Sequence, residues 1–341
     1  MTPREIVIAQ INHQETEYVP YNFRIEPDAE AILTKHYGSE EWKKKLICPI
    51  AKGPSFFDSW QAVKSVDPND PTKWIDVYGN CWTSNGHVHH LDRNAMYGIE
   101  PEDYKWPVLS DFMWPGRPEQ LQEWAQNIPS DRFSTISIGA GHWELTWRLL
   151  GVEEALIMCL AEPERFDWII ENVDRLINQF VDVLIQTPAD ALMIADDWCD
   201  QRSCIMGPDR WRTFIKPRLA KIYKKIHDSG KYVINHVCGN VEPLLPDLIE
   251  IGLDVLESVQ PEAMNVYEMK RKYGDKITFY GGLGCQHTLA FGTPDEVRAE
   301  IRKLREEMSR GGGYILSSAK PINKEVPLEN MIAAYETFIE K

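Results

Sequence analysis

A histidine and a cysteine stand two positions apart at the end of an apolar run, in Val233-Ile234-Asn235-His236-Val237-Cys238-Gly239-Asn240. Successive side chains of an extended strand point to opposite faces, so His236 and Cys238 are expected on the same face. Imidazole and thiolate are both good zinc ligands, and two ligands from one strand end leave room for others. The alternative is a hydrogen-bonded core histidine beside a small buried cysteine, which is a common arrangement in proteins.

A third ligand would have to come from a neighbouring strand. Cys285 is a candidate because it follows the predicted strand Ile277–Tyr280 and a glycine-rich stretch. This strand is the second one along the chain after the strand that ends at His236. His287 lies two residues after Cys285. The alternative is that Cys285 is a loop thiol without a function.

Two adjacent carboxylates, Asp196 and Asp197, follow the apolar run that ends at Ala195. A strand that ends in paired acids places at least one of them at the end of the sheet, where it could act as general acid or base or join a metal site. The alternative is that one of them caps the following helix or pairs with an arginine, for which Arg210 and Arg212 are candidates.

Other polar or aromatic side chains close neighbouring segments. Glu144 follows the predicted strand Ser134–Ile138, Glu257 lies in another predicted strand, and Lys320 follows the last one. Trp198 adds an aromatic surface next to the acid pair. We take Glu144 as a candidate catalytic or substrate-contacting residue, and Glu257, Lys320 and Trp198 as candidate substrate-binding residues, although lysines are more often solvated. The run His87-Val88-His89-His90 lies in a polar segment and is interpreted as surface histidines or a substrate contact.

Short apolar runs alternate with long amphipathic segments from about residue 130 onward, which is typical of a parallel sheet wrapped by helices. The predicted strands are Tyr18–Phe23, Ser134–Ile138, Ala191–Ala195, Tyr232–His236, Val255–Val259, Ile277–Tyr280 and Tyr314–Leu316. Helices are predicted over Glu164–Ile185, from Thr293 to the glycines at 311–313, and over Leu328–Ile339, the second with Thr293 as its N-cap and Glu296 completing a capping box.

The segment 38–130 breaks this alternation because it is rich in proline, glycine, asparagine, aspartate and aromatic residues. Within it, Asp76–Trp82 is interpreted as a hairpin or tight turn. We expect this segment to be an elaborate insertion near the mouth of the sheet within a single domain, 1–341, because no linker delimits it.

Bulk properties restrict the function. The net charge of −15 opposes binding to nucleic acid or to an anionic membrane. The first residues lack the apolar run of a signal peptide, and the seven scattered cysteines do not suggest a disulfide framework, so a cytoplasmic location is expected. The sequence has neither a P-loop nor a glycine fingerprint for dinucleotides after a strand, and it lacks the G-x-S-x-G motif of α/β-hydrolases.

Several of these stretches together resemble the uroporphyrinogen decarboxylase superfamily. They are Ile11–Glu15 before Val19-Pro20, Ala195–Trp198 through Trp211–Arg218, His236–Asn240, Gly281-Gly282 followed by Gln286, Phe291–Val297 and Val326–Asn330. The resemblance covers most of the chain in the expected order. It implies a (β/α)8 (TIM) barrel with its pocket at the C-terminal ends of the strands, and it adds Gln286 to the candidate substrate-binding residues.

The superfamily contains two kinds of enzyme. True decarboxylases carry an arginine-rich P-V-W-x-M-R-Q-A-G-R motif, which Val19–Ile25 does not reproduce. The other branch resembles zinc- and corrinoid-dependent methyltransferases, in which an H-x-C pair and a later cysteine bind zinc. The later cysteine is replaced here by Ser318-Ala319-Lys320. This departure implies that Cys285 substitutes for it, that an acid completes the site, or that zinc is absent. It disfavours the thiol-methylating subgroup and leaves the donor-demethylating subgroup open.

The sequence therefore predicts a methyltransferase that moves a methyl group between a small donor, such as a methoxy compound, and a corrinoid carried by a partner protein. His236, Cys238 and Cys285 are the predicted zinc ligands, and Asp197, with Asp196 beside it, is the predicted general acid. Two alternatives remain: a metal-free lyase that resembles the decarboxylases and acts on a smaller carboxylic acid, and a non-catalytic binding barrel.

Overall fold

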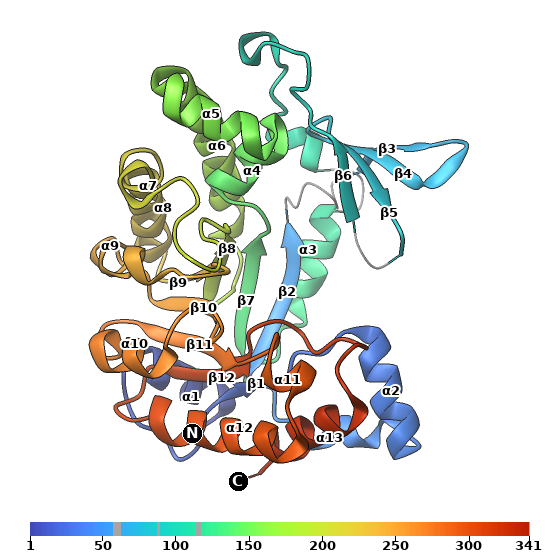
Figure 1. The fold of residues 1–341 in the computed structure, drawn as a ribbon, viewed down its shortest axis with the longest axis vertical. Coiled ribbons are helices and arrows are strands. Elements are labelled where there is room, and N and C mark those ends of the chain that lie inside the picture. The colour runs from blue at the N-terminus through green and yellow to red at the C-terminus, as the bar shows by residue number, and fades with distance from the viewer. Residues whose placement is uncertain (57–62, 87–88, 114–116, 341) are drawn as a thin grey trace.

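Eight parallel strands form a nearly closed barrel in the computed structural model, which describes residues 1–56, 63–86, 89–113 and 117–340 (Figure 1). Their order is β1-β12-β11-β10-β9-β8-β7-β2, so β1 and β2 stand at the two ends of the sheet. The strands are β1 Tyr21–Asn22, β2 Ile50–Phe56, β7 Phe133–Ile138, β8 Ala191–Ala195, β9 Tyr232–His236, β10 Val255–Val259, β11 Thr278–Leu283 and β12 Tyr314–Ser318. The predicted α/β barrel is confirmed.

Helices cover the outer face of this barrel and connect its strands (Figure 1). They are α1 Pro3–Ile11, α2 Pro27–Tyr37, α3 Arg117–Gln126, α4 His142–Leu150, α5 Val152–Ala161, α6 Pro163–Leu184, α7 Pro208–Phe214, α8 Lys216–Asp228, α9 Leu245–Glu250, α10 Val266–Tyr273, α11 Thr288–Phe291, α12 Pro294–Met308 and α13 Leu328–Phe338. Short 3₁₀ helices occupy Glu40–Lys45, Pro101–Asp103, Leu109–Phe112 and Glu242–Leu244.

The strands are buried on both faces because side chains fill the barrel and helices cover its outside. Every residue of β10, β11 and β12 is buried, which explains why these strands are mostly apolar and do not alternate with exposed polar residues. The helices bury one stripe only, and α6 does so with apolar residues at three- and four-residue steps. The predicted capping box of α12 is present, since Thr293 and Glu296 each accept a backbone N–H of the other.

Helix α1 closes the N-terminal end of the barrel. Its Val7 and Ile11 belong to a buried apolar cluster made by inward-facing residues of the strands, namely Ile50, Phe133, Ala191, Ile234, Val255, Tyr280 and Ile315. This cluster is separate from the larger core between the sheet and the helices. The polar side chains discussed below therefore gather at the opposite, C-terminal end, as in other α/β barrels.

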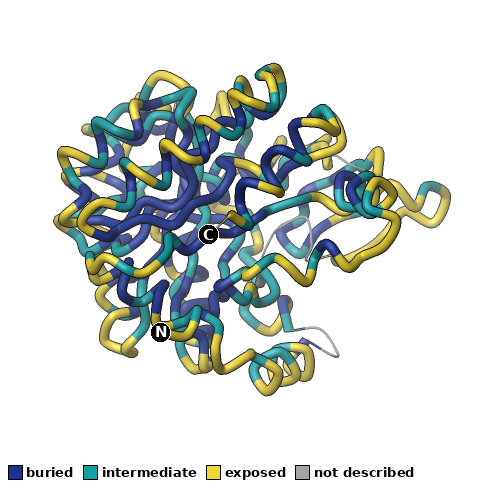
Figure 2. Tube along the Cα trace, turned by 90° about the horizontal axis from the view of Figure 1, so that it is seen from below, coloured by how far each residue is buried: buried dark blue, intermediate teal, exposed yellow. Residues whose placement is uncertain are grey.

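A second, antiparallel sheet projects from the barrel (Figure 1). Its strands are β3 Val63–Asp67, β4 Asp70–Asp76, β5 Cys81–Ser84 and β6 His89–Arg93, in that order. The predicted hairpin at Asp76–Trp82 is present as the turn between β4 and β5. Figure 2 shows that exposed residues follow the projecting hairpin and the outer helices, whereas buried residues fill the barrel.

β7, β11 and β12 differ from their predicted bounds by one to three residues, and two other barrel strands differ more. β1 is limited to two residues of the predicted strand Tyr18–Phe23. β2 lies inside the segment that was predicted to be irregular, and its pairing with β7 shifts register between Lys52 and Ser55. The Lys52-Gly53-Pro54 sequence at this irregularity resembles a turn, which is why the pattern did not indicate a strand. In the parts of the chain that the structure describes, no helix is long and apolar enough to cross a membrane.

Candidate metal centre

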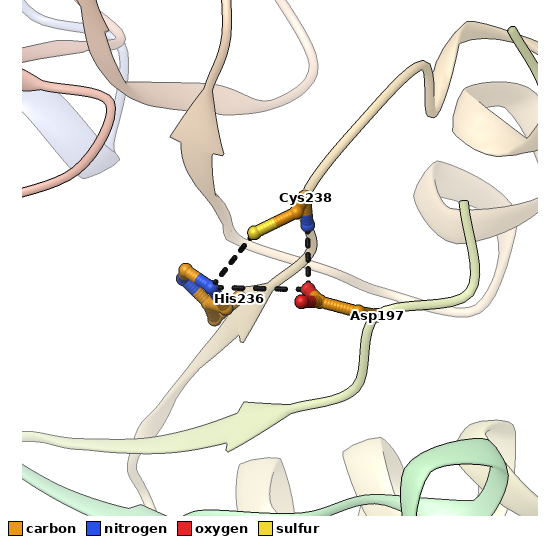
Figure 3. Close-up of side chains that lie close together, drawn as sticks. All are labelled: Asp197, His236 and Cys238. Carbon is orange, nitrogen blue, oxygen red and sulfur yellow. Dashed lines mark hydrogen bonds and ion pairs between the residues drawn. The ribbon is translucent and has the colours of Figure 1, made fainter. Parts of the chain in front are cut away.

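Asp197, His236 and Cys238 come together where β8 and β9 end (Figure 3). The Sγ atom of Cys238 lies 3.3 Å from Nε2 of His236, and the same nitrogen lies 3.8 Å from Oδ1 of Asp197. One donor atom from each residue lies within 4.8 Å of the other two. Among the described residues, this is the only group of three or more histidines, cysteines and acids with that property.

The two strands position these side chains in different ways. β9 ends at His236, and the alternation of an extended backbone carries Cys238 to the same side, as the H-x-C spacing predicts. β8 pairs with β9 so that Ala195 lies opposite His236, which brings the residues that follow both strands together. Asp197 is fixed by the backbone N–H of Cys238, which donates to its Oδ1 over 2.7 Å.

Buried charges orient the imidazole of His236. Its Nδ1 atom lies 2.5 Å from Oε2 of Glu257, which is almost fully buried in β10. Arg24, just after β1, donates to the other oxygen of Glu257. Burial would raise the pKa of Glu257, but His236 and Arg24 outweigh it and hold that pKa well below its usual range. Burial would lower the pKa of His236, but Glu257 and then Cys238 raise it to about 10.

This donor set fits a zinc ion. A tetrahedral zinc with ordinary bond lengths separates a sulfur and a nitrogen ligand by about 3.6 Å, and a nitrogen and an oxygen ligand by about 3.3 Å. The observed 3.3 Å and 3.8 Å lie close to these values. A metal-bound histidine usually donates its other ring N–H to a carboxylate, and Glu257 is placed to accept it from His236. A three-residue set also leaves a position for a substrate atom.

Asp196, the neighbour of Asp197, is fully buried and caps helix α4. Its carboxylate accepts the backbone N–H groups of Trp143 and Glu144 over 3.0 and 2.8 Å, and the indole N–H of Trp198 over 2.6 Å. The close approach requires glycine at position 141, where a Cβ would lie 2.6 Å from the Asp196 side chain. Burial nevertheless raises the pKa of Asp196 to about 6. One acid of the pair therefore caps a helix, as the alternative for Asp196 and Asp197 proposed. The capped helix is α4, which precedes Asp196 in the chain, and not the helix that follows it.

Glu144 faces the same end of the barrel from the first turn of α4. Its Oε1 lies 3.2 Å from a guanidinium nitrogen of Arg148, one turn later in the helix. Burial raises the pKa of Glu144 to about 8, although the charge of Arg148 opposes the shift. Asp197, Asp196 and His236 also affect this pKa, so Glu144 lies within electrostatic reach of the cluster.

Lys320 approaches the cluster from the segment after β12. Its ammonium group makes a hydrogen bond with Cys238, and its pKa is raised because Cys238, Asp197 and Glu257 together outweigh burial. Cys285, two residues after β11, is within electrostatic reach of Lys320 but is not one of the three clustered residues. Burial raises the pKa of the Cys285 thiol, as does Glu262, whereas Lys320 lowers it. The acid Asp197, rather than Cys285, thus stands beside His236 and Cys238.

The other predicted residues lie elsewhere. Trp198 is fully buried, so its ring lies in the core behind the acid pair. Gln286 is exposed, and its backbone N–H donates to Glu262. Arg212 is bound to Asp209 and Asp247, so this candidate counter-ion pairs with other acids than Asp196 and Asp197. His89 is exposed on β6, as is His90, whereas positions 87 and 88 lie outside the described residues.

Arg24 was not predicted as part of this site. Its partner Glu257 is 233 positions away in the sequence. Lys52 in β2 is a second cation that the sequence did not indicate. Burial lowers its pKa, the charge of Arg24 lowers it further, and Glu257 raises it. No local signal identifies it, because the segment Lys52-Gly53-Pro54 does not read as a strand in the sequence.

The family is decided by the sequence of the C-terminal two thirds of the chain. Residues 123–340 match the profile described as uroporphyrinogen decarboxylase (URO-D). The chain belongs to the uroporphyrinogen decarboxylase family. The matched region contains β7 to β12, and therefore Asp197, His236, Cys238, Glu257 and Lys320.

Characterised relatives of this family member are enzymes of two kinds. The methylcobamide:CoM methyltransferase MtaA of Methanosarcina barkeri is 25% identical over 185 residues, which cover 54% of this chain and 52% of the relative. A uroporphyrinogen decarboxylase of Pseudoalteromonas translucida is 21% identical over 176 residues, covering 51% of this chain and 48% of the relative. The chain thus spans about half the length of the curated relatives it matches. The resemblance predicted from the motifs is confirmed.

A solved structure described as a methyltransferase from Methanosarcina mazei shares the whole fold. It superposes with a TM-score of 0.72 and 18% sequence identity over 99% of this chain and 98% of that chain. At this identity the likeness concerns the fold alone. It extends the barrel comparison to the N-terminal residues that the family profile does not cover.

Proposed function

We propose that this protein is a zinc-dependent methyltransferase that moves a methyl group between a small methoxy donor and a corrinoid carried by a partner protein. The observation that carries the proposal is the cluster of Asp197, His236 and Cys238, with the second nitrogen of His236 held by Glu257. The relatedness to MtaA, whose name includes methyl transfer from a methylcobamide, supports the choice of reaction.

In this proposal, Asp197, His236 and Cys238 hold the zinc ion. When bound, the zinc acts as a Lewis acid that withdraws electron density from the donor oxygen and makes it a better leaving group. Glu257 and Arg24 orient the ring of His236, so that its Nε2 atom points to the position shared with Asp197 and Cys238.

The leaving oxygen must gain a proton when its bond to the methyl carbon breaks. Asp197 was the predicted donor, but as a metal ligand it would be ionised, so we assign this role to Glu144. Its raised pKa of about 8 keeps the carboxyl group protonated at neutral pH. Arg148, bound to Glu144, would then stabilise the carboxylate that remains after transfer.

Metal content tests this proposal directly. The protein is purified without chelators, and zinc per chain is measured for the wild type and for His236→Ala, Cys238→Ser and Asp197→Asn. The matched control is Cys285→Ser, which removes a thiol just after β11, two strands away from β9 and outside the cluster. We expect about one zinc per chain in the wild type and the control, and strongly reduced zinc in the three cluster variants.

Zinc in the wild type would then justify screening methoxy compounds for methylation of reduced cobalamin, followed by its visible absorption. If the wild type binds no zinc even when zinc is supplied, the mechanism is wrong. Loss of zinc in Cys285→Ser would contradict the assignment of Asp197 as the third ligand. Zinc binding without any transfer would retain the metal site and refute the proposed substrates.

A further inference from the structure

Two cysteines face each other in a short hairpin that begins just after Asp197. Cys199 and Cys204 are partners in an antiparallel bridge. The backbone N–H of Asp200 donates to the carbonyl of Ser203 over 2.9 Å, and that of Ile205 donates to the carbonyl of Trp198 over 2.8 Å. These two bonds lie on either side of the cysteines. Cys199 and Cys204 therefore form a non-hydrogen-bonded pair, in which neither residue makes a backbone hydrogen bond with the other.

This type of pair brings the two side chains close. Opposite residues at such positions have Cα atoms about 4.5 Å apart. Disulfides form between cysteines whose Cα atoms lie about 4.4–6.8 Å apart. Both thiols are free here, and they already make a hydrogen bond with each other. The backbone therefore meets the main distance requirement of a disulfide without a change of register.

The hairpin contacts the loop that carries Cys238. The backbone N–H of Asn240 donates to the carbonyl of Asp200 over 2.7 Å, and its side-chain amide donates to the carbonyl of Arg202 over 3.0 Å. Gly239, at φ +84°, lies so close to the hairpin that a Cβ there would be 2.2 Å from the carbonyl oxygen of Asp200. The hairpin that carries the cysteine pair thus follows Asp197 directly and is hydrogen-bonded to the loop that carries Cys238.

We propose that Cys199 and Cys204 form a reversible intramolecular disulfide when the protein meets a small-molecule disulfide such as oxidised glutathione. The proposal does not depend on the methyltransferase function or on a bound metal. It assigns a modification site to a hairpin whose cysteines are outside the metal cluster.

The exchange balances as two successive substitutions at sulfur. The thiolate of Cys204 attacks one sulfur of the small disulfide, whose S–S bond breaks and releases one small thiol. The sulfur of Cys199 then attacks the mixed disulfide at the sulfur of Cys204, and a second small thiol leaves with the proton that Cys199 gives up. The two cysteines lose two electrons and two protons, and the small disulfide gains them.

Cys204 is the better first nucleophile. The hydrogen bond from Cys199 lowers its pKa, as do the backbone N–H groups of Met206 and Gly207, although burial opposes them. Both cysteine side chains are buried, whereas Gln201 and Arg202 at the tip of the hairpin are exposed. Attack on an oxidant therefore requires the tip to open, and oxidation should be slower than that of a surface thiol.

Peptide mapping of the full-length protein tests the proposal. The protein is equilibrated with glutathione at several ratios of the oxidised to the reduced form, quenched with acid, alkylated and digested with trypsin. Trypsin cleaves after Arg202, between the two cysteines, so the two halves stay joined only if the disulfide is present. Circular dichroism confirms that the fold is retained at each ratio.

The variants Cys199→Ser and Cys204→Ser should lack the joined peptide, and Cys159→Ser, which removes a buried thiol of α5, should retain it. The joined peptide should also disappear when the oxidised protein is treated with a reducing agent. The proposal is overturned if the folded wild type yields two separately alkylated peptides at every ratio, or if the joined peptide forms only after unfolding in urea. Stable glutathione adducts in place of the joined peptide would overturn it as well.

Discussion

The carboxylate of Glu257 determines how well the site should hold a metal, and Glu257→Gln tests this. The substitution keeps the size of the side chain and one acceptor oxygen for Nδ1 of His236, but it removes the negative charge. A partner of this kind typically contributes 10- to 100-fold to metal affinity. We therefore expect the dissociation constant for zinc to increase by roughly 10- to 100-fold, which corresponds to about 1.4–2.7 kcal/mol.

Glu257→Gln should also lower the free energy of unfolding, because it leaves Arg24 without its carboxylate partner. The side chain of Arg24 is mostly buried, and Glu257 is the carboxylate to which it is bound. Breaking a buried ion pair by removing one partner costs about 3–5 kcal/mol, and some of this cost is recovered here because the glutamine side chain can still accept one hydrogen bond. We expect the melting temperature of the metal-free protein to fall clearly. Arg24→Met, which leaves the contact between Glu257 and His236 intact, should lower stability with a smaller loss of zinc affinity.

Zinc affinity is measured by competition with a chromophoric chelator at fixed pH, after circular dichroism has confirmed that each variant is folded. The matched control is Glu242→Gln, which makes the same change at a partly exposed ion pair with Lys272. The control should bind zinc like the wild type. If Glu257→Gln also binds zinc with unchanged affinity, then Glu257 does not orient His236 for a metal, and the reasoning is refuted.

Three further predictions concern separate parts of the molecule. Burial raises the pKa of Asp76, the last residue of β4, to about 6 from 3.8, so the folded state binds this proton more tightly than the unfolded state. Stability from this group is therefore present at low pH and lost as the pH rises through about 6, by on the order of 3 kcal/mol. Denaturant titrations between pH 4 and 7 should show this slope in the wild type and a flatter one in Asp76→Asn, and equal slopes would contradict it. Gly141→Ala should lower the free energy of unfolding by about 1–3 kcal/mol, because the added methyl group meets Asp196 at 2.6 Å; an unchanged denaturation midpoint would show that Asp196 can move at no cost. Lys320→Met should bind zinc several-fold more tightly than the wild type in the same chelator competition, because the ammonium group that makes a hydrogen bond with Cys238 no longer competes with the metal for this sulfur. Weaker binding in Lys320→Met would mean that the lysine supports the site.

The barrel could be predicted from the sequence where its strands are continuous apolar runs followed by amphipathic helices. β9 and β10 have the predicted bounds. β2 could not be predicted, because Lys52 and the Gly53-Pro54 pair interrupt the apolar pattern at the point where the register shifts. This segment is recognised as a strand in the structure because it pairs with β7, its neighbour at the end of the sheet.

The same distinction applies to the site. The alternation of a strand is enough to place His236 and Cys238 on one face, because it involves neighbours in the sequence. The choice between Asp196 and Asp197 depends on where β8 ends and on a helix N-terminus more than fifty residues earlier, so the local sequence does not distinguish the two acids. The contacts of Arg24 with Glu257 and of Lys320 with Cys238 join strand ends far apart in the chain, and no local pattern indicates them.

Because α1 closes one end of the barrel, it restricts how substrates reach the site. Val7 and Ile11 fill one end of the barrel with apolar side chains, so a molecule cannot reach Cys238 from that end. If a methyl donor and a bulky acceptor both react here, both approach the site from the C-terminal end of the barrel. The smaller reactant must then either be seated before the larger one arrives or leave before it docks, and a large excess of donor should slow the reaction by blocking the acceptor.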